Sequence, residues 1–129
     1  MLSLLAALLV LTADPESIGP PAPAPSLAGY YAFTGRNPDG EEYRGVATLS
    51  ASGAGYRLLW VYDDGKVAAA TAVVDGDRLI AGWGNGVGTW AVKVGDDGVV
   101  TLHGKFHLAG QKNGGTETLT FLRRFFKEL

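Results

Sequence analysis

The chain has 129 residues, which is enough for one domain with one core. With 11 basic and 13 acidic residues the formal net charge is −2, so no strong field would attract nucleic acid or an anionic membrane. The absence of cysteine excludes disulfides, thiol catalysis, cysteine-ligated zinc and cysteine lipidation. A hydrophobic content of 47% excludes a disordered chain, and 19 glycines without a three-residue period indicate many tight turns.

The N-terminal segment has the pattern of an export signal. Leu2 to Leu11 is an almost unbroken apolar run of the length of a signal-peptide core, too short to span a bilayer as a helix. No Lys or Arg precedes it, and a buried N-terminal helix is the alternative. Residues 1–13 are therefore predicted to be a signal peptide, and 14–27, with five prolines, a stiff Pro-rich linker. The protein is expected to be secreted or periplasmic in a bacterium.

From Leu27 onward, apolar residues recur with period two and turn signals follow about every ten residues, which predicts an all-β domain over 28–129. Strands are expected at 29–36, 42–50, 55–62, 66–74, 78–84, 87–94, 99–107 and 116–124. The connectors hold Asn, Asp and Gly, which favour turns. Because each connector is short, each strand should pair antiparallel with the next.

Two hairpins allow a register to be predicted. With Asn85-Gly86 as a two-residue turn, Trp83 pairs with Gly88 and Ala81 with Trp90. In the second hairpin, pairing Leu49 with Tyr56 brings Gly45 opposite Trp60, a small–large match suited to a narrow interior.

Eight consecutive hairpin-linked strands with one apolar face have two economical solutions, a closed barrel and a two-sheet sandwich. We expect an eight-stranded antiparallel up-and-down β-barrel, because the meander is uninterrupted and closure removes exposed edges. Such a barrel is either filled by side chains or holds one small ligand.

Several glycine and aromatic motifs carry a resemblance: GYYAFTGRNPDGEEYRG (29–45), YRLLW (56–60), GDRL (76–79), GVGTW (86–90) and GTETL (115–119). In these the chain resembles a family of small exported bacterial proteins often labelled fibronectin-binding, whose barrels are similar to those of avidins and lipocalins. The resemblance implies this calycin-type fold and no catalytic residues. It also implies that a late arginine, Arg123 or Arg124, covers Tyr30 or Tyr31 of the first strand as a cation–π contact.

The inward positions of the predicted strands are rich in aromatic residues, which could clasp a flat apolar ligand or fill the barrel completely. They are Tyr31, Phe33, Tyr43, Tyr56, Trp60, Tyr62, Trp83, Trp90, Phe106 and Phe121. As ligand-binding candidates we take Tyr31, Tyr43, Tyr56, Trp60, Tyr62, Trp83, Trp90 and Glu117.

Glu117 is the one acid on the predicted inward face, which it shares with Leu119 and Phe121. A buried carboxylate must be hydrogen-bonded, paired or neutralised. The tyrosines at 31, 43, 56 and 62 could donate to it, either in a network that closes the barrel or at a ligand site.

Other motifs carry no chemistry. His103 and His107 share a strand face but stand about 13 Å apart, so they cannot hold one metal ion, and they are predicted to face outward. The acidic turns at 63–64, 75–77 and 96–97 are too short for calcium, and no helix follows the GNGVG segment as a phosphate loop requires. We therefore expect no enzyme activity, metal or cofactor.

The expected function is that of a non-catalytic exported binding module for a small hydrophobic or aromatic ligand, or for an extracellular protein. The alternative is a solid-core structural or inhibitory domain that acts through its loops and outer surface. The outward positions show no large apolar stripe, and the oligomeric state is left open.

Overall fold

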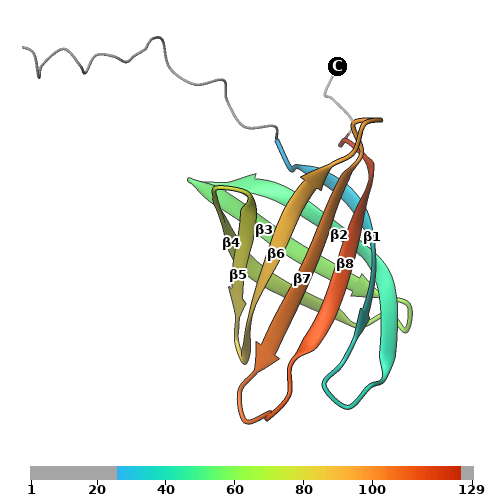
Figure 1. Cartoon of the computed structure of the whole chain (residues 1–129), viewed down its shortest axis with the longest axis vertical. Coiled ribbons are helices and arrows are strands. Elements are labelled where there is room, and N and C mark those ends of the chain that lie inside the picture. The colour runs from blue at the N-terminus through green and yellow to red at the C-terminus, as the bar shows by residue number, and fades with distance from the viewer. Residues whose placement is uncertain (1–25, 126–129) are drawn as a thin grey trace, which may run out of the picture.

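The computed structural model describes residues 26–125, so the predicted signal peptide and most of the Pro-rich linker lie outside the described residues. The described chain forms one closed antiparallel barrel in which every strand pairs with its neighbours in sequence and β8 pairs with β1 (Figure 1). Its strands are β1 (Gly29–Arg36), β2 (Glu42–Ser52), β3 (Gly55–Tyr62), β4 (Val67–Asp75), β5 (Arg78–Trp83), β6 (Gly86–Val94), β7 (Val100–Leu108) and β8 (Gly115–Arg123). The up-and-down barrel is confirmed, and each strand boundary lies within two residues of its prediction.

The acidic turns close their hairpins by local hydrogen bonds. The Asp64 carboxylate accepts a bond from the Lys66 backbone N–H at 3.0 Å, and Asp97 accepts one from Val99 at 3.0 Å. Gly65 and Gly98 follow these aspartates with φ of 90° and 82°, the left-handed region that favours glycine. These aspartates therefore serve turn geometry, as their spacing predicted.

Both predicted hairpin registers are wrong by two residues. Trp83 pairs with Gly86 and Ala81 with Gly88, so the β5–β6 turn is centred on Gly84-Asn85. Likewise Leu49 pairs with Leu58, and Gly45 faces Tyr62 instead of Trp60. A shift of two keeps every side chain on its predicted face, because side chains alternate with period two. The predicted interior is therefore preserved although the individual pairs differ.

Glycines leave space for large rings inside the barrel. Gly104 pairs with Trp90, and a Cβ at Gly104 would lie only 2.5 Å from Trp90 Cγ and 2.6 Å from the Thr89 carbonyl oxygen. Gly35 pairs with Tyr43 and leaves room for that ring in the same way. The expected small–large complement is thus present, but at pairs other than Gly45 and Trp60.

The end of the barrel that holds residues 26–28 and 123–125, here called the base, is closed by packed side chains. Leu27 is 4% exposed and packs into the core. The Tyr31 hydroxyl donates to the Leu27 carbonyl oxygen at 2.7 Å, and the Leu27 N–H donates to the Tyr56 hydroxyl at 3.1 Å. At the same end Arg123 covers the Tyr30 ring with Cζ 4.5 Å from the ring centroid. This is the late arginine contact that the family resemblance implied.

Removing the Tyr31 hydroxyl tests the seal at the base. Tyr31→Phe should lower the free energy of unfolding by about 1–2 kcal/mol, because the buried Leu27 carbonyl loses its donor. Tyr30→Phe is the matched control, since that hydroxyl makes no hydrogen bond within residues 26–125, and it should change stability by less than about 0.5 kcal/mol. Urea melts measure both, and equal losses would contradict the role given to Tyr31.

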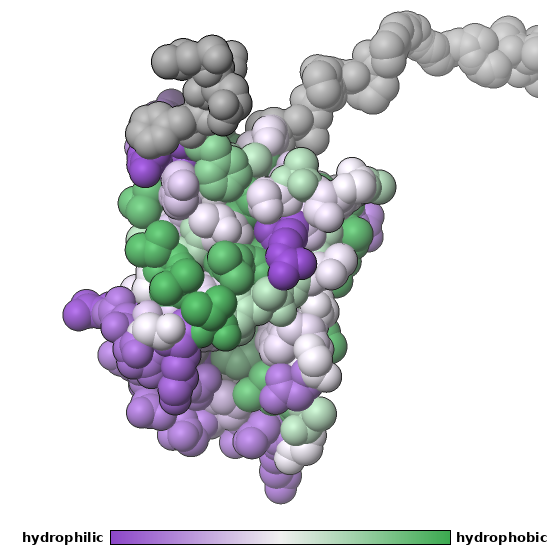
Figure 2. All heavy atoms as spheres, turned by 180° about the vertical axis from the view of Figure 1, so that it is seen from behind, coloured by the Kyte–Doolittle hydropathy of each residue, from purple (hydrophilic) through white to green (hydrophobic). Residues whose placement is uncertain are grey.

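The outer surface is more apolar than the sequence led us to expect. Val46 of β2 pairs with Val61 of β3, which pairs with Val67 of β4, and all three are exposed. Figure 2 shows an apolar area on the face of the barrel that lies at the back of Figure 1. The prediction of no large apolar outer stripe did not include this contact, because the three valines adjoin only once the strands are in register.

Candidate functional site

The other end of the barrel, here called the mouth, is hollow. It is the end formed by the connections 37–41, 63–66, 84–85 and 109–114, at the bottom of Figure 1. A cavity of about 250 Å³ lies there, with room for several water molecules. Its lining residues come from six strands and two turns: Asn37, Tyr43, Trp60, Tyr62, Ala68, Trp83, Asn85, Trp90, Phe106 and Leu108. The interior is thus open at the mouth, whereas Leu27 and its two tyrosine partners close it at the base. A separate hollow of about 400 Å³ lies at the base end, beside Ser26, Phe121 and Phe125.

Six aromatic residues line this cavity, and we call the five whose rings are in mutual contact the aromatic cage: Tyr43, Trp60, Tyr62, Trp83 and Phe106. Tyr43 lies between two rings, with centroids 5.6 Å from Tyr62 and 6.4 Å from Phe106. Trp83 continues the chain of contacts, 6.3 Å from Phe106 and 5.4 Å from Trp60. Edge-to-face and tilted pairs at these separations are favourable. The contacts hold the rings in a fixed arrangement around the hollow.

Glu117 lies behind this wall as a buried carboxylate. It is 4% exposed, and its two oxygens accept one hydrogen bond each, from the Tyr43 hydroxyl at 2.8 Å and from the Trp60 indole N–H at 3.1 Å. Glu117 pairs with Gly35 on β1 and with Gly104 on β7. Because neither neighbour carries a side chain, the Tyr43 and Trp90 rings have space beside the carboxylate.

Burial raises the pKa of Glu117 to about 7, although the hydrogen bonds from Trp60 and Tyr43 act to lower it. Trp90 also acts to lower this pKa, yet its indole N–H has no hydrogen-bond partner within the described chain, so we treat it as a nearby dipole and not as a bonded donor. Burial and the charge of Glu117 raise the pKa of Tyr43 far above its ordinary value. Tyr43 therefore remains a protonated donor at neutral pH.

The structure divides the predicted ligand-binding residues into two groups. Tyr43, Trp60, Tyr62, Trp83 and Trp90 line the cavity, with Glu117 directly behind Tyr43 and Trp60. Tyr31 and Tyr56 do not line it, because both lie at the base, where they bond to Leu27. Glu117 faces inward, as predicted, and one of the four candidate tyrosines is its donor.

Sequence reasoning missed some members of the site. It did not name Trp60 as a donor to Glu117, nor Asn37 and Asn85 at the cavity rim. A signal for the space around Glu117 was present in the glycines at inward positions 35 and 104. The sequence alone does not show that these two glycines adjoin Glu117, because that depends on the register of β8 with β1 and β7.

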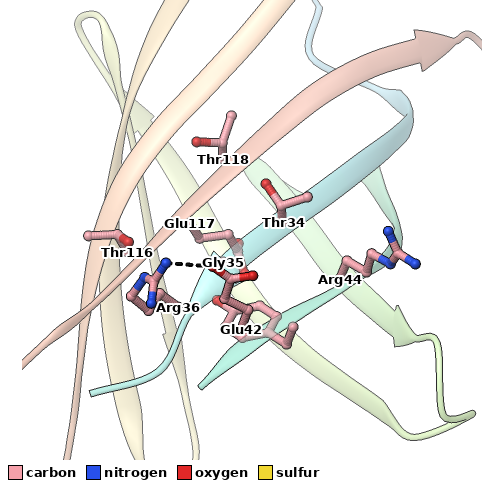
Figure 3. A pocket seen from close by; sticks show the side chains of 9 residues that line it. Thr34, Gly35, Arg36, Glu42, Arg44, Thr116, Glu117 and Thr118 are labelled. Atoms are coloured by element: carbon pink, nitrogen blue, oxygen red, sulfur yellow. Dashed lines mark hydrogen bonds and ion pairs between the residues drawn. The ribbon is translucent and has the colours of Figure 1, made fainter. Parts of the chain in front are cut away.

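A second hollow, of about 460 Å³, lies on the outside of the barrel over β8, β1 and β2 (Figure 3). It is lined mostly by outward threonines and charged side chains, and it reaches the same Glu117 and Tyr43 that lie at the mouth cavity: Thr34, Gly35, Arg36, Glu42, Tyr43, Arg44, Thr116, Glu117 and Thr118. Arg36 is paired with Glu42, as the dashed line in Figure 3 marks, and Arg44 with Asp63 at 3.0 Å. These ion pairs are exposed and their charges already satisfied, so this hollow is a weaker candidate than the mouth.

The histidines and other acidic groups offer no second centre. His103 and His107 are exposed on β7, as predicted, and His103 Nδ1 lies 3.3 Å from the Thr118 hydroxyl. Within residues 26–125 no group of three His, Asp or Glu side chains is placed to hold a metal ion. No helix among these residues has the length and hydrophobicity to cross a membrane.

Comparisons with known proteins do not identify a family for this chain. No family model matches the chain, and no curated protein matches it. Among solved structures, a de novo designed fluorescence-activating β-barrel matches 74% of this chain and 94% of its own, with 15% identity and a TM-score of 0.49. The resemblance to exported fibronectin-binding proteins therefore stays a prediction.

Proposed function

We propose that the protein is a non-catalytic binding module that takes one small ligand with a flat or rounded apolar part into the mouth cavity. The observation that carries this proposal is the hollow mouth walled by aromatic rings, in a barrel whose base is closed. A volume of about 250 Å³ lies just below the range of drug-sized sites, which favours a small ligand.

The polar groups at the cavity are few and well placed for orientation. Asn37 and Asn85 lie in turns at the rim, and the Tyr43 hydroxyl retains acceptor capacity after it donates to Glu117. A few polar groups on an apolar wall are typical of ligand sites. Catalysis would require a second titratable group beside Glu117, and the lining offers only tyrosines in that role.

The alternative of a solid-core interaction domain is less well supported, since the void at the mouth is larger than a few waters. No particular observation favours an extracellular protein as the partner. Export to the periplasm or the medium remains part of the proposal and is based on residues 1–13 alone.

Tryptophan fluorescence tests the proposal, because the chain has three tryptophans and all line the cavity. We expect at least one of benzyl alcohol, benzamide and benzyltrimethylammonium to change the emission saturably. Ala68→Leu fills the cavity and should weaken that binding at least about tenfold, since it removes the space the ligand occupies. Ala69→Leu, on the outward side of the same strand, should leave it unchanged.

Two results would contradict the proposal. The first is no saturable change with any of the three compounds. The second is equal affinity of Ala68→Leu and the native protein, which would place the ligand outside the mouth. Thermal melts of both variants establish that they are folded before binding is compared.

A further inference from the structure

The lining of the mouth cavity carries no positive charge to balance Glu117, and the two arginines of the neighbouring hollow, Arg36 and Arg44, are paired with other carboxylates. Glu117 is buried and forms no ion pair with any residue in the described part of the chain. The residues that line the cavity include no Lys, Arg or His. A buried carboxylate without a positive partner is costly, and its charge is only partly offset by two neutral donors.

The two donors that bond to Glu117 also form part of the cavity wall, so the negative charge of the carboxylate affects the rings that face the cavity. The Tyr43 O–H and the Trp60 N–H point at the carboxylate, while both rings belong to the cavity wall. A hydrogen bond to an anion polarises its donor, so electron density in both rings rises. The faces of Tyr and Trp rings already attract cations through their quadrupoles. The aromatic cage is therefore more attractive to a cation than five isolated rings would be.

On the basis of the proposed function, we propose that the ligand of the mouth cavity is a small organic cation. Its alkylammonium or quaternary ammonium group lies within the aromatic cage, in front of the Tyr43–Glu117–Trp60 network. Aromatic cages of this composition suit quaternary ammonium groups, which are large, weakly hydrated and need no hydrogen-bond acceptor. An inorganic divalent cation is not suited, because it requires several oxygen ligands.

A matched pair of ligands isolates the charge. Choline and 3,3-dimethylbutan-1-ol have nearly the same shape, and only choline is charged. Isothermal titration calorimetry of the native protein at pH 8.5, where Glu117 with its pKa of about 7 is ionised, should give at least about tenfold tighter binding of choline, the combined effect of several cation–π contacts. An equal concentration of sodium chloride in both titrations controls for ionic strength.

Two variants test the source of the preference. Glu117→Gln should reduce the preference for choline to less than about threefold while binding of the alcohol changes little, because the cavity wall stays in place. Trp83→Leu removes one ring without touching a hydrogen bond of Glu117, and should weaken choline more than the alcohol. Should Glu117→Gln fail to fold, Trp83→Leu still tests the cation–π contact.

The outcomes separate this inference from the proposed function. If the alcohol binds as tightly as choline, the cavity is a ligand site and the cation preference is refuted. The same holds if neither binds while benzyl alcohol or benzamide binds at least as tightly as benzyltrimethylammonium. If nothing binds at the mouth, both proposals fail. A choline preference that survives in Glu117→Gln and in Trp83→Leu would also overturn the inference.

Discussion

Raising the pH from 5 to 8.5 should destabilise the native protein by about 2–3 kcal/mol relative to its Glu117→Gln variant. The folded pKa of Glu117 is about 7, whereas an exposed glutamate titrates near 4.5. The folded state therefore holds a proton over this interval that the unfolded state has lost. Stability contributed by the protonated group is complete below about pH 4.5 and is lost as the pH rises through 7.

The comparison with glutamine isolates this group. The glutamine side chain has the shape of the protonated acid and does not titrate, so other carboxylates cancel when the two stability curves are subtracted. Urea melts at half-unit intervals of pH provide the curves. Glu41→Gln, which removes an exposed carboxylate from the loop 37–41, should leave the pH dependence of the native protein in place. A difference between the native protein and Glu117→Gln that stays constant across this range would refute the assignment of Glu117 as a buried, desolvated acid.

Gly104→Ala should destabilise the barrel by about 1–3 kcal/mol and disturb the site. The added methyl would lie 2.5 Å from Trp90 Cγ and 2.6 Å from the Thr89 carbonyl oxygen, so the ring or the backbone must move. Adding a methyl group to a packed interior lowers the free energy of unfolding by about this amount, because side chains or backbone must shift to make room. Because Gly104 pairs with Glu117, the shift of Trp90 should also move the apparent pKa of that carboxyl.

Gly82→Ala is the matched control. Gly82 also lies in a strand, but no atom lies within 4 Å of the position a Cβ would take. That substitution should be neutral or stabilising by a few tenths of a kcal/mol, since alanine loses less backbone entropy than glycine on folding. Equal effects of the two substitutions in a chemical melt would show that Gly104 is not required by the Trp90 ring.

The fold was predictable because two simple signals agree. Period-two alternation and short polar turns determine which residues form strands, which neighbours pair and which face each side chain takes. Glu117, Trp60 and Tyr43 are inward for this reason. The exact register was not determined, since a slip of two residues satisfies the same pattern, and the β5–β6 turn is centred one residue earlier than Asn85-Gly86.

The site was only partly predictable for the same physical reason. Which aromatic residues line the mouth and which close the base depends on their height along the barrel, and the register determines that height. Tyr31 and Tyr56 could not be separated from Tyr43 and Tyr62 by sequence pattern alone. The hydrogen bond from Trp60 to Glu117 joins residues 57 positions apart on strands that are not adjacent. No local sequence pattern therefore predicts it.

The most direct test of the mouth as a binding site is an NMR titration that follows the three tryptophan indole N–H signals together with the backbone amides. The ligand is whichever compound binds most tightly in the calorimetric and fluorescence experiments. The signals of Trp60 and Trp83 should move saturably in the native protein and in Ala69→Leu, and should stay in place in Ala68→Leu. Shifts confined to the outer hollow around Thr34, Thr116 and Thr118, with unmoved indole signals, would contradict a ligand site inside the barrel.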